Sequence, residues 1–164
     1  MRLKALTNAS MVILHAQDLA IEERHVQIFR ETGLAEDGDE SLALTFFSGA
    51  SLEELKDNGG HLFLGTNASI APGDVLRIKI WFRGFHGDLG SSGFFYGNRK
   101  VDGQLYEGLW TDLQPTGART VFPCIDQPEY KATFKVSQRS SPGAILKSRK
   151  EWFSCKIAIR LGII

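Results

Sequence analysis

Several patterns that identify common protein classes are scarce in this chain of 164 residues. Basic and acidic residues number 19 each, so there is no positive excess for a dedicated nucleic-acid or membrane-surface binder. Two cysteines, Cys124 and Cys155, are too few for the disulfide framework of a small secreted domain. No apolar run is long enough to span a membrane, and Met1 does not lead into a signal peptide. The composition predicts one globular domain with no nucleic-acid partner and no membrane insertion.

Catalytic and metal-binding constellations are equally scarce. The four histidines, His15, His25, His61 and His86, occur singly, and none has the His-Glu-x-x-His spacing with which a helix binds zinc. His15 lies in an apolar stretch, where a histidine satisfied within the core is more usual than a metal ligand. Cys124 as a nucleophile is a minor alternative, because it follows a proline in an apolar run without a basic neighbour. The sequence therefore predicts no catalytic residue and no metal site.

Period-two alternation of apolar and polar residues dominates what the chain does contain. After a turn at Pro72-Gly73-Asp74, the apolar residues of one strand face are Leu76, Ile78, Ile80 and Phe82. Further strands are expected over 10–16, 25–30 and 42–47, and near the end of the chain over 152–161. The predicted fold class is mainly β, an antiparallel domain of sandwich or open-sheet type.

Three short segments have other signals. Ser51-Leu52-Glu53-Glu54 fits a capping box and predicts a helix of one or two turns that stops by 58–60. The acidic stretch 36–40 is expected to be an exposed loop tip, because it lacks the spaced ligands of a calcium loop. Two Asn-Ala-Ser triplets make Asn8 and Asn67 candidate N-glycosylation acceptors, which would suit a secreted protein.

The segment 111–134, TDLQPTGARTVFPCIDQPEYKATF, carries the most specific pattern. It closely resembles a signature of the aminopeptidase N family of zinc metallopeptidases, approximately T-Q-x-E-x-T-x-A-R-x-x-F-P-C-x-D-E-P-x-x-K-A-x-F. The matching positions are Thr111, Thr116, Ala118, Arg119, Phe122, Pro123, Cys124, Asp126, Pro128, Lys131, Ala132 and Phe134. Upstream, ILHAQDLAI (13–21) and LRIKIWFRGFHGD (76–88) resemble family segments as well. The likeness runs from about residue 7 to about residue 137.

The resemblance implies an N-terminal domain with a saddle-like β-sheet over 1–137, incomplete because the family's first strands are missing. Residues 138–164 would be a divergent basic tail with one strand. In the family, this domain covers a thermolysin-like zinc domain and lends residues to the substrate cleft. The zinc motif and the G-A-M-E-N loop of that second domain are absent here. No cofactor is therefore expected in this chain, although the full-length family uses zinc.

Two substrate-binding positions of the family fall on Asp112 and Gln114. The family's glutamine lines the pocket for the first side chain, and its glutamate binds the substrate's free α-amine, a charge-assisted bond that suits a carboxylate. Here Gln114 keeps an acceptor without the charge, and Asp112 adds a carboxylate on the same face if both lie in one strand. An interpretation in which both are ordinary polar residues of a relic site stays open.

The other motif residues are expected to be structural. The planar fork of Arg119 suits carbonyls or a carboxylate at the turn. Pro128 holds Gln127 extended and directs the chain into a strand over 130–136. The structural motif as a whole comprises Arg119, Phe122, Pro123, Cys124, Asp126 and Pro128.

Two functions of different classes follow. In the first, the chain is a non-catalytic N-terminal domain or fragment of an aminopeptidase N-like zinc metallopeptidase, and the intact family removes the first residue of peptides. In the second, it is a free-standing β module whose open strand edges bind a peptide or a protein, including a catalytic domain or a full-length homologue. Some family members are extracellular ectodomains of membrane-anchored enzymes and others are cytoplasmic, so the compartment stays open.

Overall fold

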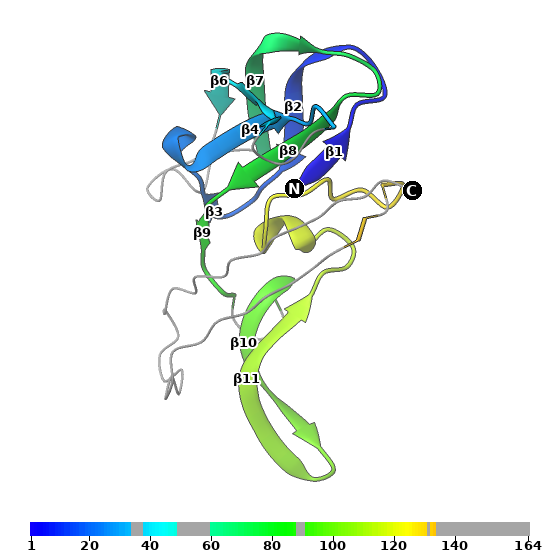
Figure 1. Ribbon diagram of the computed structural model, residues 1–164. Helices are drawn as coiled ribbons and strands as arrows, with labels where there is room; N and C mark the ends of the chain where they lie inside the picture. Colours follow the sequence, from blue (N-terminus) through cyan, green and yellow to red (C-terminus); the bar gives the residue numbers. More distant parts are fainter. Residues whose placement is uncertain (34–37, 49–59, 88–90, 131, 134–164) are drawn as a thin grey trace.

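The computed structural model describes residues 1–33, 38–48, 60–87, 91–130 and 132–133. These residues form a mainly β structure of several antiparallel sheets, with two 3-10 helices, η1 (Glu23–His25) and η3 (Ala118–Thr120) (Figure 1). The predicted mainly β, antiparallel fold class is confirmed. The helix predicted at Ser51 and the strand predicted over 152–161 lie outside the described residues.

Two sheets make up the body of the molecule. The first has the order β1 (Arg2–Lys4), β8 (Val75–Ile80), β4 (Val26–Arg30) and β5 (Glu40–Leu42). The second has the order β2 (Ala9–His15), β7 (His61–Ile70) and β6 (Leu44–Ser48). A two-stranded sheet of β3 (Leu19–Ala20) and β9 (Arg83–Gly84) leads away from this body (Figure 1).

The two larger sheets share one hydrophobic core, because alternate residues of each strand point the same way. Ile78 and Ile28 from the first sheet and Leu14 and Leu64 from the second belong to the same buried cluster. Full burial of such a side chain stabilises the fold by about 1.5–3 kcal/mol. On β8 the predicted apolar face is correct for Leu76 and Ile78, while Ile80 is only half-buried.

Two predictions about the segment 36–47 are wrong in part. The strand expected over 42–47 is two strands, β5 and β6, which belong to different sheets. The break falls at Ala43, whose N–H donates to Asn67 Oδ1 (3.1 Å) and whose carbonyl accepts from the N–H of Asn67 (3.1 Å). Asp39, expected on an exposed loop tip, has a side chain only 5% exposed, because it pairs with Arg77 at 2.6 Å.

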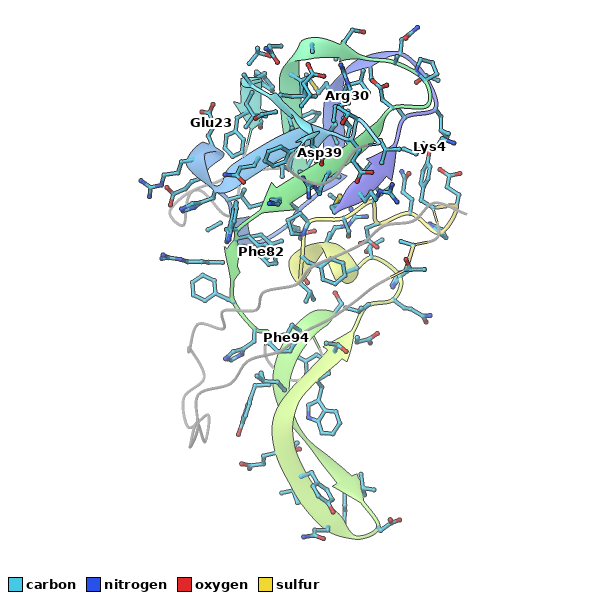
Figure 2. The ribbon with its side chains drawn as sticks, in the orientation of Figure 1. Lys4, Glu23, Arg30, Asp39, Phe82 and Phe94 are labelled. Carbon is cyan, nitrogen blue, oxygen red and sulfur yellow. The ribbon has the colours of Figure 1, made fainter. Side chains whose placement is uncertain are left out.

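A long hairpin of β10 (Gly93–Val101) and β11 (Gln104–Asp112) extends from the body (Figure 1). Its two-residue Asp-Gly turn has φ of +50° at Asp102 and +82° at Gly103, as the right-handed twist of a tight hairpin favours. At its base, the N–H of Gly87 donates to the carbonyl of Phe94 (2.7 Å), a residue labelled in Figure 2. Among the described residues, the hairpin is thus joined to the body mainly at one end.

The start of β10 needs glycine for two reasons. Gly93 has φ of +90°, and a Cβ there would overlap Thr120 Oγ1 on η3. We expect Gly93→Ala to lower the free energy of unfolding by about 1–3 kcal/mol, because side chains disfavour this conformation. Gly108→Ala, where a Cβ would meet no atom within 4 Å, should change it by less than about 0.5 kcal/mol. Urea unfolding measures both; equal losses would contradict the packing described here.

Candidate functional site

The segment after the hairpin, residues 112–128, folds back from the end of β11 to the body. A turn closes where the N–H of Gly117 donates to the carbonyl of Leu113 (3.0 Å), and η3 follows. After η3, the side chains of Val121, Phe122 and Cys124 are buried in the core. The loop therefore has an exposed first half and a second half that is fixed by packing.

A hydrogen-bonded anchor joins this second half to the end of β2. The N–H of His15 donates to the carbonyl of Cys124 (2.7 Å), and the N–H of Cys124 donates back to the carbonyl of His15 (3.0 Å). The N–H of Asp126 donates to His15 Nδ1 (3.1 Å), so the ring must be unprotonated at that nitrogen. The two segments that resemble the aminopeptidase N family, 13–21 and 111–134, are therefore in direct contact.

Arg119 and Asp126 complete the anchor. Arg119 Nε donates to Asp126 Oδ2 (3.0 Å), and Arg119 Nη2 donates to the Asp126 carbonyl (3.1 Å). The N–H of Arg119 also donates to Asp126 Oδ2 (3.2 Å), and the carbonyl of Arg119 accepts from the N–H of Gln17 (2.9 Å). Since both side chains are largely buried, these contacts make Arg119 a fixed part of the scaffold.

The surroundings of this anchor shift the pKa of two side chains. Burial lowers the pKa of His15, and the nearby Arg119 and His61 lower it further. Burial, followed by the Asp126 carboxylate, raises the pKa of the Cys124 thiol to about 12, which Arg119 offsets only in part. Cys124 is therefore protonated at neutral pH and is unsuited to act as a nucleophile.

Asp112 and Gln114 lie on the exposed half of the loop. The two residues do not lie in one strand, because β11 ends at Asp112 and Gln114 lies in the turn that follows, before Pro115. Proline has no N–H for a strand ladder, which favours this break. The N–H of Gln114 is 3.4 Å from Asp112 Oδ1, so the two residues are still neighbours. Both leave polar groups open to a ligand.

The described residues do not fit a zinc site. Within this part of the chain, no group of three or more His, Cys, Asp or Glu side chains is placed to hold a metal ion. His15 and His61 are paired across β2 and β7 with ring centroids 5.1 Å apart, but no described His, Cys, Asp or Glu side chain completes a ligand set there. In the same part of the chain, no helix is long and apolar enough to cross a bilayer.

The two Asn-Ala-Ser triplets differ in their surroundings. Asn8 is exposed between β1 and β2. Asn67 is exposed on β7, but its side-chain oxygen accepts from the N–H of Ala43. Glycosylation at either residue stays a prediction.

A comparison with protein families identifies the domain. Residues 1–144 match the model of the peptidase M1 N-terminal domain. The chain belongs to this family. The match begins before the residue-7 limit suggested by the motifs, and it includes β1 and the whole of the anchored loop.

Curated relatives of this M1 domain are aminopeptidases. Aminopeptidase Q of Mus musculus is 34% identical over 80 residues, 49% of this chain, and glutamyl aminopeptidase of Rattus norvegicus is 39% identical over 71 residues, 43% of this chain. Endoplasmic reticulum aminopeptidase 2 of Homo sapiens is 27% identical over 136 residues, 82% of this chain. The aligned segments make up 14%, 7% and 13% of those proteins, so the chain spans a small part of their length.

The anchor predicts a pH dependence. His15 has a folded-state pKa below its unfolded value of about 6.5, so the unfolded chain binds more protons between these two values. The contribution of His15 to stability should be constant above about pH 6.5 and should be lost as the pH drops through this window. His15→Asn offers an acceptor that does not titrate. This variant should lose less unfolding free energy than the original chain as the pH drops, as measured by urea unfolding. The same smaller loss in His86→Asn, a hairpin-side control, would contradict the assignment.

The Arg119–Asp126 pair gives a second prediction. Asp126→Ala leaves the largely buried Arg119 guanidinium without its carboxylate, so we expect a loss of about 2–3 kcal/mol of unfolding free energy. Glu22→Ala breaks the exposed Glu22–Arg24 pair and should cost less than about 1 kcal/mol. Thermal unfolding monitored by circular dichroism measures both. A loss in Asp126→Ala no larger than in the control would show that the anchor is dispensable.

Proposed function

We propose that this chain acts as the N-terminal domain of an aminopeptidase N-like zinc metallopeptidase and has no peptidase activity by itself. The observation that carries the proposal is the loop 112–116, which is exposed while its continuation is fixed to β2 through the His15–Cys124 contacts. A loop held in this way presents polar groups at a defined position without belonging to the core. The catalytic zinc would be bound by another domain.

Asp112 and Gln114 are the residues that the loop would present to a peptide substrate. A free α-amine is cationic at neutral pH, and a carboxylate is the stronger acceptor for it. We assign that role to Asp112, while the Gln114 side chain supplies an uncharged acceptor and donor beside it. The 3.4 Å contact between Asp112 Oδ1 and the N–H of Gln114 supports a common site.

The finer architecture is part of the same proposal. The saddle-like or sandwich form and the boundary near residue 137 are inferred from the resemblance. The shared core of the two larger sheets supports a sandwich.

A second function, a free-standing β module that binds a peptide or protein, is favoured by a separate observation. An open groove of about 460 Å³ runs beside β2 and is lined mainly by apolar side chains. It involves neither Asp112 nor Gln114. Such a module could pair with a catalytic domain or a full-length homologue.

The first function is tested by joining this chain to the catalytic part of human endoplasmic reticulum aminopeptidase 2, in place of its own matching domain. Gln114→Glu adds a carboxylate, so kcat/KM for substrates with a free α-amine should rise about tenfold, while Asp112→Asn should lower it by a similar factor. Cleavage is followed with chromogenic amino-acid amides, and zinc chelation should abolish it.

The matched control is Glu107→Gln, on the hairpin but away from the loop, which should leave kcat/KM unchanged. Unaltered kinetics in both Asp112→Asn and Gln114→Glu would refute the cleft role. Chelator-sensitive cleavage by the original chain alone would refute its non-catalytic character.

A further inference from the structure

The groove beside β2 opens between the edges of the two larger sheets. It is lined by the N-terminal segment from Leu3 to Thr7, by residues of β2, and by Ile125, Gln127 and Tyr130. The volume of about 460 Å³ is within the range of about 300–1,000 Å³ that is usual for ligand pockets. The floor reaches core residues, among them Ile70 and Leu76.

The edge of β2 that faces this groove has unpaired backbone groups. His15 directs its N–H and carbonyl away from β7, toward Cys124. Because hydrogen-bonding directions alternate along an antiparallel strand, Ile13 and Met11 direct theirs to the same side. Beyond Cys124, the N–H of Asp126 donates to the His15 ring instead of continuing the ladder. Within the described residues, the backbone groups of Ile13 and Met11 have no hydrogen-bond partner on that side.

The strand β1, which also lines the groove, has an open edge as well. On β1, Met1 and Ala5 make backbone hydrogen bonds toward β8, to Ile78 and Asp74. The intervening Lys4 therefore directs its backbone groups away from β8. No strand of the described part of the chain adjoins β1 on that side. Figure 2 labels Lys4 on this edge strand.

Side chains along the groove are apolar and exposed. Ile13 is 51% exposed and Leu6 is 67% exposed, and Met11 and Tyr130 are also accessible to solvent. The stretch Ala9–Leu14 has no charged residue and no proline, the devices that usually protect an edge strand from pairing. Among the described residues that line the groove, Lys4 has the one lysine, arginine or carboxylate side chain.

We propose that this groove binds one extended peptide segment of a partner protein, which adds as a strand to the free edge of β2. The occupant has alternating apolar side chains, which replace water over Ile13 and the groove floor, and a carboxylate at the end next to Lys4. This inference rests on the second candidate function and is independent of the substrate loop.

The test uses the full chain and a synthetic peptide in which threonine alternates with valine, ending in a free carboxylate. Amide hydrogen exchange, followed by NMR, should slow about tenfold at Met11 and Ile13 when the peptide is present at about ten times its Kd. The amides of β6, at the far edge of the same sheet, are the internal control and should not change. A peptide with alternate nitrogens methylated, which removes the donors of one edge, should give no protection.

Two variants distinguish peptide binding in the groove from nonspecific adsorption to exposed apolar side chains. Ile13→Lys should abolish the protection by placing a charge beside β2, and Phe46→Lys, at the exposed far edge of the sheet, should not. Unchanged exchange at saturating peptide, or equal protection by the methylated peptide, would overturn the proposal. Slow exchange at Met11 and Ile13 before peptide is added would overturn it too, because the edge would then be filled from within the chain.

Discussion

The reciprocal hydrogen bonds between His15 and Cys124 are the contact on which the organisation of this domain depends. They join residues 109 positions apart in the sequence, which brings the end of β2 against the loop that follows the hairpin. Closing such a long loop is entropically unfavourable, so the contact is supported by a buried thiol and by the Arg119–Asp126 pair. The position of the exposed loop 112–116 is a consequence of this arrangement.

The four-stranded sheet and the groove beside β2 differ in how many polar contacts a ligand would have to displace. On the four-stranded sheet, Arg77 is paired with Asp39, and both Arg77 and Lys79 lie over the ring of Phe29 at 5.3 Å. These charges already have partners, so a ligand there would have to displace them. The groove beside β2 has few polar side chains to displace. Binding is therefore expected on the groove side, separate from the Asp112 loop.

Period-two patterning was sufficient to predict the fold class, since Leu76 and Ile78 needed only alternation to be placed in the core. It failed at Ala43, because the contact that ends one strand there comes from Asn67, on a strand that is distant in sequence. The turn at Gln114 had a local signal in Pro115, which has no N–H for a strand ladder. The role of the His15 ring depends on the Asp126 N–H, 111 residues away, and no local pattern predicts such a contact.

The shape of the β10–β11 hairpin has a mechanical consequence. Nine residues of strand span about 30 Å, and the described hydrogen bonds to the body lie near the base. A rotation of about 10° there would displace the Asp102-Gly103 tip by about 5 Å, on the scale of one strand spacing. The hairpin would thus rotate as a unit about its contact with the body at Gly87 and Phe94. A force applied at the tip would be transmitted directly to β11 and to the loop at its end.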